Sequence, residues 1–127
     1  MPSLRFCVLD PELAVVRLEE GDGLPGWATR GDLWGVIRAP GELTVVCETS
    51  QVPAGARAET GWMAFRLQGP FPFDSVGVLA AVAAPLAAAG VSIFALSTFD
   101  TDIVLVKRTQ IETAVLALQG AGLTLFG

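Results

Sequence analysis

The chain has 127 residues, a formal net charge of −5, and 52% hydrophobic against 17% charged residues. Such a chain fits one compact domain or two small halves sharing a core, and its low charge content indicates an apolar surface that self-association would cover. The acidic balance gives no electrostatic footprint for nucleic acid or for an anionic membrane. Because histidine is absent from the sequence, Ser-His and Cys-His nucleophile pairs and imidazole metal ligands are excluded.

The two cysteines and the start of the chain bear on its location. Cys7 and Cys47 lack CxxC spacing and lie in apolar runs, so we expect buried, inert thiols of a reducing compartment, with a disulfide or a reactive thiol as the alternative. No charged region with a long apolar core follows Met1, so no signal peptide is expected. The chain is therefore predicted to be cytoplasmic.

The first half of the chain is predicted to be strand-rich. Apolar runs alternate there with turns that contain Pro or Gly, and a short turn is expected around Trp27. The segment 51–60 has the composition of a linker or of a short helix. The predicted strands are residues 4–9, 13–18, 33–38 and 42–47, and the last two are expected to form a hairpin.

The second half reads as strand, helix, strand, strand, helix, strand. The first helix is expected over about 75–89, with Asp74 or Ser75 as its N-cap and Gly90 just past its end. The spacing of Thr109-Gln110-Ile111-Glu112 predicts a capping box for the second helix. The strands are expected at residues 62–67, 91–97, 102–107 and 123–126, which gives the βαββαβ order of a ferredoxin-like α+β sandwich.

One uncharged stretch, residues 76–96, has the length of a membrane span. Pro85 is expected to interrupt the helix there, and Gly90 to end it before the composition changes to β-branched and aromatic residues. Both flanks are acidic, without a basic anchor. We therefore expect a buried helix followed by a buried strand, and no contact with a membrane.

Two polar segments beside these apolar elements predict a ligand pocket. A helix N-terminus carries unpaired amides and a partial positive charge, which can hold a carboxylate, and Gly77 would allow close approach to it. Asp102 could hold an ammonium or guanidinium group, and Phe73 and Phe99 could form a wall. Together these groups suit an amino acid. The candidate ligand-binding residues are Phe73, Asp74, Ser75, Val76, Gly77, Thr98, Phe99, Asp100 and Asp102.

Each of these residues also has a purely structural explanation. Asp74 can be a helix cap only, Asp100 and Asp102 are common turn formers, and Phe73 and Phe99 are each more typical of a core. A divalent metal on the two turn aspartates is disfavoured because no further acids lie nearby in the sequence. We predict no metal, no cofactor and no catalytic residue.

A resemblance to a known family rests on these motifs. The βαββαβ order with Phe-Asp-x-x-Gly-Val-Leu at the first helix, and the pattern of residues 83–93 followed by Ser97-Thr98-Phe99-Asp100-Thr101-Asp102, resemble the ACT domain. Within that group they are similar to small stand-alone bacterial ACT proteins and to the CASTOR arginine sensors. The resemblance covers about residues 61–127, which would form the ACT domain, and residues 1–60 match in outline as a degenerate ACT-like half.

The resemblance implies that an amino acid binds at an interface between two ACT units whose sheets pair edge to edge, so a chain this short would act as a homodimer. It places ligand contacts on residues 73–77 and on Thr98, Phe99 and Asp102. In the sensors, an acidic residue follows the helix-starting aspartate, and this chain has Ser75 there; Pro72 likewise replaces a glycine. The loss of one anion weakens the case for arginine as the ligand.

Three functions are compatible with these features. The first is a non-enzymatic regulatory module that binds a small amino acid, and the second is a ligand-free structural or adaptor subunit that docks another protein. The third is a catalytic protein that uses Asp100 or Asp102, which the lack of histidine and of a dense acid cluster disfavours. We favour the first.

Overall fold

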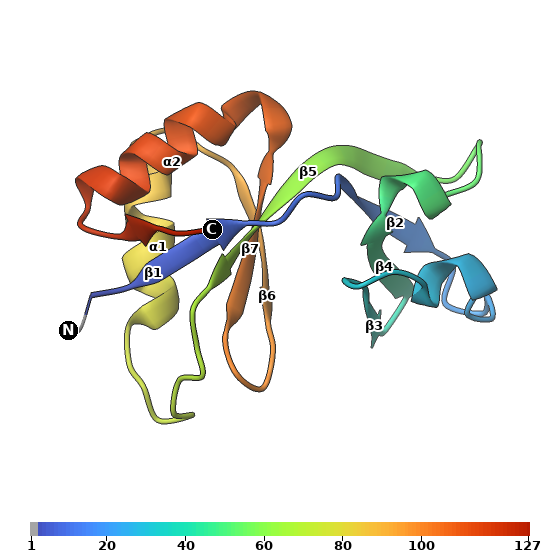
Figure 1. Cartoon of the computed structure of the whole chain (residues 1–127). Helices are drawn as coiled ribbons and strands as arrows, with labels where there is room; N and C mark the ends of the chain where they lie inside the picture. Colours follow the sequence, from blue (N-terminus) through green and yellow to red (C-terminus); the bar gives the residue numbers. More distant parts are fainter. Residues whose placement is uncertain (1–2) are drawn as a thin grey trace. The chain divides into compact units, whose positions relative to one another are not determined.

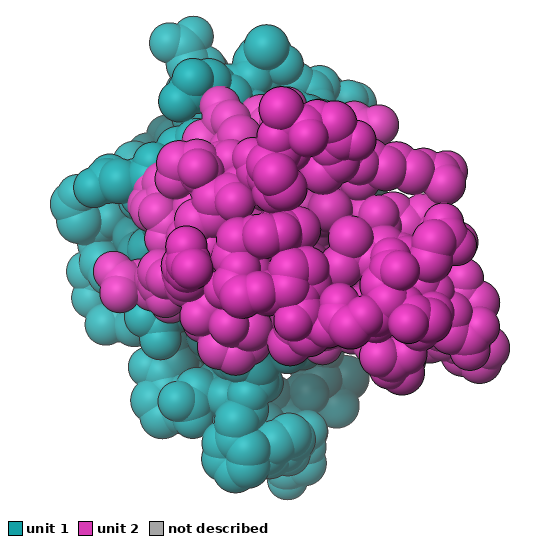
Figure 2. Space-filling model, turned by 90° about the vertical axis from the view of Figure 1, so that its right-hand side faces the viewer, with its two compact units in different colours: residues 1–10, 63–127 teal, residues 11–62 magenta. Residues whose placement is uncertain are grey.

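The computed structural model describes residues 3–127, which form eight strands, two α-helices and three 3₁₀ turns (Figure 1). The chain divides into two compact units, coloured separately in Figure 2: unit 1 contains residues 1–10 and 63–127, and unit 2 contains residues 11–62. The sequence indicates a boundary at residue 60, whereas in the structure residues 3–10 group with residues 63–127.

Unit 1 has the expected α+β architecture. The predicted βαββαβ order is confirmed: β5, α1, β6, β7, α2 and β8 follow one another along the chain. Strand β1 lies between β5 and β8, antiparallel to β5 and parallel to β8, so the strand order is β6-β7-β5-β1-β8. The elements are β1 (Arg5–Val8), β5 (Ala58–Leu67), α1 (Val78–Ala88), β6 (Ile93–Ser97), β7 (Asp102–Lys107), α2 (Ile111–Gly120) and β8 (Thr124–Leu125).

The core of unit 1 lies between this sheet and the two helices. Alternate residues of the strands face the helices because successive strand side chains point to opposite faces. From the helices, residues spaced by four positions meet them. The core includes Phe6, Phe65, Leu67, Val104 and Val106 from the sheet, Val82 and Leu86 from α1, and Ala114 and Leu118 from α2. Phe6 and Phe65 are in aromatic contact, with ring centroids 5.4 Å apart.

Helix α1 begins three residues later than predicted. Its N-cap residue is Gly77, in the left-handed conformation with φ +84°, and no side chain caps it. The expected capping by Asp74 or Ser75 is therefore wrong. The Ser75 N–H donates instead to the Pro72 carbonyl at 3.0 Å, which closes a turn before the helix and leaves Asp74 and Ser75 in an exposed loop.

Two further expectations for the helices are wrong. Pro85 lies inside α1, which continues to Ala88, and the Pro85 carbonyl still accepts the Ala89 N–H at 3.1 Å. The capping box is absent because a 3₁₀ turn, Arg108–Gln110, runs directly into α2. The N-cap residue Gln110 makes no side-chain capping bond, and its Nε2 donates instead to the Gly90 carbonyl at 3.2 Å. Within residues 3–127, neither helix is long and apolar enough to cross a membrane.

Unit 2 contains β2 (Leu13–Leu18), β3 (Gly35–Ala39), β4 (Glu42–Glu48) and the first part of β5, in the order β3-β4-β2-β5. The predicted hairpin is confirmed, with Gly41 at φ +83° in its turn. Short 3₁₀ turns occupy Gly26–Thr29, around Trp27 as expected, and Thr49–Gln51. The core of the unit contains Ala14, Val16, Ala28, Val45 and Cys47.

Candidate ligand-binding site

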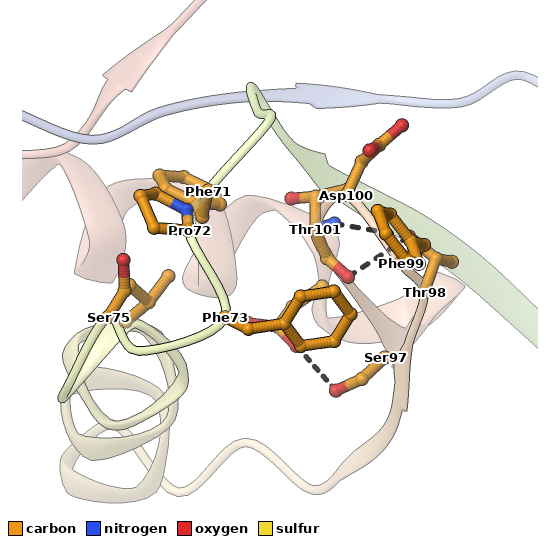
Figure 3. Close-up of a pocket in the computed structure, with 11 residues that line it drawn as sticks. Phe71, Pro72, Phe73, Ser75, Ser97, Thr98, Phe99, Asp100 and Thr101 are labelled. Carbon is orange, nitrogen blue, oxygen red and sulfur yellow. Dashed lines mark hydrogen bonds between the residues drawn. The ribbon is translucent and has the colours of Figure 1, made fainter.

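A cavity of about 220 Å³ opens in unit 1 between the loop that enters α1 and the turn that joins β6 to β7 (Figure 3). Both segments follow a strand of the same sheet, which is why residues 20 or more positions apart meet there. The lining residues are Phe71, Pro72, Phe73, Ser75, Val78, Ser97, Thr98, Phe99, Asp100, Thr101 and Asp102.

The turn wall of the cavity is held by a dense set of hydrogen bonds. The Thr98 N–H donates to the Thr101 carbonyl at 2.8 Å, and the Thr101 N–H donates to the Thr98 hydroxyl at 3.1 Å. The buried Thr101 hydroxyl donates to the Leu67 carbonyl on β5 at 3.0 Å. Asp102 lies opposite Ser97 in the strand register, and its Oδ1 accepts the Ser97 hydroxyl at 2.5 Å. This wall therefore presents a carboxylate in a fixed orientation.

The loop wall is held at its two ends. The Phe71 N–H donates to the Asp100 carbonyl at 2.8 Å, which ties the loop to the turn, and Gly77 reverses the chain into α1. Between these points, Phe73, Asp74 and Val76 are exposed.

Two aromatic rings stand at the mouth of the cavity. Phe73 and Phe99 are 76% and 79% exposed, so the alternative explanation that each is a core residue is wrong. Their rings meet edge to face, with centroids 4.7 Å apart and planes at 84°. The contact joins the two walls, and Figure 3 shows the Phe73 ring directed toward Phe99. An edge-to-face pair is a favourable arrangement of aromatic quadrupoles, and here it leaves much apolar area open to solvent.

The charges of the cavity suit a ligand with both signs of charge. Asp100 and Asp102 both belong to the turn wall, with the Asp100 carboxylate directed away from the loop in Figure 3, and among the described residues no lysine or arginine lines the cavity. Val78, the first residue of α1, lines the other side. The first N–H of the helix to bond within it is that of Ala81, donated to the Gly77 carbonyl, so the amides before it are available to an anion. The turn wall with its aspartates therefore suits an ammonium group, and the side formed by the start of α1 suits a carboxylate.

The structure brings together six of the nine predicted ligand-binding residues. Phe73, Ser75, Thr98, Phe99, Asp100 and Asp102 line the cavity. Asp74, Val76 and Gly77 belong to the same loop but do not line it, and Val76 is 88% exposed. The lining residues that were not predicted are Phe71, Pro72, Val78, Ser97 and Thr101. The position of Ser97 opposite Asp102 followed from the hairpin, whereas the burial of Thr101 depends on a contact with β5 that local sequence does not indicate.

The cysteines are both free, but they differ in exposure. Cys47 is buried, and burial together with the negative charge of Glu48 raises the pKa of its thiol, as expected of an inert thiol. Cys7 is only half-buried, so the expectation that both are buried is wrong for this residue. It lies on β1 next to the core residue Phe6 and therefore points to the other face of the sheet. Nowhere in residues 3–127 do three or more potential metal ligands gather.

Comparison with known proteins gives two family matches. Residues 57–120 match the ACT domain family, and residues 12–55 match a family described as an N-terminal domain. The human protein named cytosolic arginine sensor for mTORC1 subunit 1 is 41% identical over 59 residues, which is 46% of this chain and 18% of the sensor. The chain therefore matches less than a fifth of the length of this relative.

Solved structures extend the similarity to the whole chain. The protein Atu0741 from Agobacterium tumefaciens has a TM-score of 0.93 and 34% identity, covering 99% of this chain and 94% of that one. The ligand-free regulatory subunit of aspartate kinase from Thermus thermophilus has a TM-score of 0.60 and 15% identity, covering 91% and 95%. At that identity, the second similarity concerns the fold alone.

Proposed function

The chain belongs to the ACT domain family, and we propose that it is a non-enzymatic regulatory module that binds a small amino acid in the cavity between residues 71–78 and 97–102. ACT domains are regulatory modules. The observation that carries the proposal is the Asp102 carboxylate, held by Ser97 on one side of a small cavity whose other side is lined by the first residue of α1. An amino acid carries an ammonium group and a carboxylate, which are complementary to an aspartate and to a helix N-terminus.

The proposed binding mode assigns one role to each wall. Asp102, oriented by Ser97, accepts hydrogen bonds from the ligand's ammonium group or from a basic side chain. The first amides of α1 and the Ser75 hydroxyl hold the α-carboxylate. Phe73 and Phe99 cover the ligand's apolar atoms. The cavity of about 220 Å³ is smaller than the pockets of drug-sized ligands, which favours a small amino acid.

The name of the sensor relative makes arginine one candidate ligand. A guanidinium is bound most strongly by paired carboxylates, and this chain has Ser75 beside Asp74 where the resemblance leads us to expect a second acid. Arginine is therefore one member of the panel to test and not the favoured ligand.

We propose that the module works as a cytoplasmic homodimer. Within the described residues, β6 pairs only with β7, so its other edge is available for a second copy. The exposed rings of Phe73 and Phe99 at the cavity mouth supply apolar area that such a partner would cover. Ligand binding would order the 73–77 loop and thereby shift the equilibrium between subunit arrangements.

A thermal-shift screen against the twenty amino acids tests the binding proposal. A ligand at 100 times its Kd stabilises the folded state by about 2.7 kcal/mol, which gives a clear rise in Tm. We expect Asp102→Ala to abolish this rise while the circular dichroism spectrum of the folded protein is retained. Asp32→Ala, an exposed acid of unit 2, is the matched control and should keep the full rise.

Two results would contradict the proposal. If Asp102→Ala keeps the full ligand-dependent rise, the ligand does not bind in this cavity. If none of the twenty amino acids raises Tm, the ligand-free adaptor is the better description, and the exposed side chains of Phe73, Val76 and Phe99 would then serve protein docking.

A further inference from the structure

A second cavity in unit 1, of about 370 Å³, has a different chemical character. It shares the backbone turn at Asp100 and Thr101 with the first cavity but extends along β1 and β5. Its lining residues are Cys7, Arg66, Leu67, Gln68, Gly69, Pro70, Asp100, Thr101 and Phe126.

Arg66 gives this cavity a cation that the first cavity lacks. It lies opposite Cys7 in the pairing of β1 with β5, and both side chains alternate with core residues, so they lie on the sheet face away from the helices. The Arg66 side chain is exposed and makes no hydrogen bond or ion pair with any described residue. Its guanidinium therefore keeps its full set of donors, in the planar arrangement that matches a carboxylate.

A second arginine stands beside the cavity. The Arg5 guanidinium lies over the Phe126 ring, 4.7 Å from its centroid, which is a cation–π contact. The Phe126 N–H donates to the Phe6 carbonyl at 2.9 Å and so holds the backbone of Phe126 beside β1. The positive charge of Arg5 adds to the attraction for an anion without lining the cavity itself.

The remaining walls limit the kind of anion. Leu67, Pro70 and Phe126 present apolar and aromatic surface, which suits a ligand with an apolar body. Asp100 adds one negative charge to the lining, which disfavours a second anionic group on the ligand. The volume lies within the range of small-molecule pockets.

We propose that this cavity is a second binding site, which takes a small monocarboxylate with an apolar or aromatic body through Arg66. This site differs from the amino-acid site in its charge requirement. A carboxylate without an ammonium group meets no cationic side chain in the first cavity, where Asp102 adds a negative charge to that of Asp100, which lines both cavities. The two sites can therefore be tested with different ligands.

Benzoate and its neutral isostere benzamide form a matched probe pair for calorimetric titration of the full chain. We expect benzoate to bind saturably and at least about tenfold more tightly than benzamide, because a charge-assisted hydrogen bond contributes about that factor. Arg66→Gln should remove the preference, and Arg66→Lys, which keeps the charge but not the fork, should retain part of it. Arg30→Gln makes the same charge change at an exposed residue of unit 2 and should leave the preference intact.

Cys7 provides a local readout of occupancy. Its half-buried thiol lines the cavity, whereas Cys47 is buried with a raised pKa and should react more slowly with iodoacetamide. We expect benzoate to slow the alkylation of Cys7 in the wild type but not in Arg66→Gln, followed by mass spectrometry of the modified peptide.

The proposal is overturned if benzoate shows no saturable binding at millimolar concentration, if benzamide binds equally well, or if Arg66→Gln changes neither result. Asp102→Ala distinguishes the two sites: it should leave benzoate binding unchanged. Loss of benzoate binding in that variant would assign benzoate to the first cavity and would also overturn the proposal.

Discussion

The two walls of the first cavity are built in opposite ways. The turn at residues 97–102 is held by the Thr98–Thr101 and Ser97–Asp102 bonds within it and by the bond from Thr101 to Leu67 on β5. The loop at residues 72–77 has one internal backbone bond, from Ser75 to Pro72, and exposes Phe73 and Val76. The turn wall is therefore fixed before a ligand arrives, whereas the loop wall has few contacts that determine its position.

This difference indicates how a binding module can combine affinity with response. A pre-organised group loses little conformational entropy when it binds, so the turn can supply affinity and selectivity. A loosely held segment has several arrangements of similar free energy, and a ligand shifts their populations. In the proposed function, the turn recognises the ligand and the loop reports its presence.

The largest effect on stability is expected from a substitution in the turn wall, at Thr101. Thr101→Val removes the hydroxyl that donates to the Leu67 carbonyl and leaves that acceptor without its partner. We expect the free energy of unfolding to fall by about 1–3 kcal/mol in urea denaturation. Thr109→Val, at an exposed threonine, is the control and should change stability little. Equal stabilities of the two variants would show that the Thr101 bond does not hold the turn.

The next largest effect on stability is expected from a substitution at Gly77, where the loop wall ends. Gly77→Ala places a side chain on a residue with φ +84°, which costs about 1–2 kcal/mol for an L-residue in the left-handed region. Thermal unfolding should show this loss relative to Gly35→Ala, since Gly35 has no positive φ and no atom within 4 Å of an added Cβ. If the two variants unfold at the same temperature, the loop takes up the change without strain and is even less constrained than the structure indicates.

The smallest effect on stability is expected at Ser97. Its hydroxyl is exposed, so Ser97→Ala should lower the free energy of unfolding by only about 0.5 kcal/mol. Its effect on ligand affinity should be larger, because Asp102 loses the donor that orients its Oδ1. Titration with the amino acid found in the thermal screen measures this, with the exposed Ser92→Ala as control. An unchanged affinity would mean that Asp102 does not need Ser97 for its orientation.

Local patterns predicted the elements of the fold well where the residues themselves determine the structure. The strand at Asp102–Lys107 and the strand at Leu13–Leu18 have the bounds that the apolar runs indicated, and the βαββαβ order is as expected. The start of α1 was misplaced because Asp74 and Ser75 are good N-cap types, whereas the geometry that decides the start is the positive φ of Gly77. Asp74 and Ser75 are compatible with a helix that begins at residue 75 and also with a loop that continues to Gly77. The sequence alone therefore does not decide where α1 begins.

Long-range contacts explain what could not be predicted. The position of β1 between β5 and β8 depends on pairing over about 60 and 120 residues of sequence. The burial of Thr101 depends on its bond to β5, and the exposure of Phe73 and Phe99 depends on where two loops end in space. Composition makes a phenylalanine a core candidate, but only the tertiary arrangement shows that these two rings stand at a cavity mouth.

The path of the chain through its two units has a consequence for folding during synthesis. Strand β1 leaves the ribosome before residues 11–62, which contain every strand segment of unit 2. Its own partners, Leu67 on β5 and Leu125 on β8, follow much later. At typical elongation rates the interval between Phe6 and Leu125 is on the order of ten seconds. Unit 2 can therefore finish folding while β1 is still an unpaired apolar strand. Unit 1 is completed only after β8 has been synthesised, because β8 is the last strand that pairs with β1.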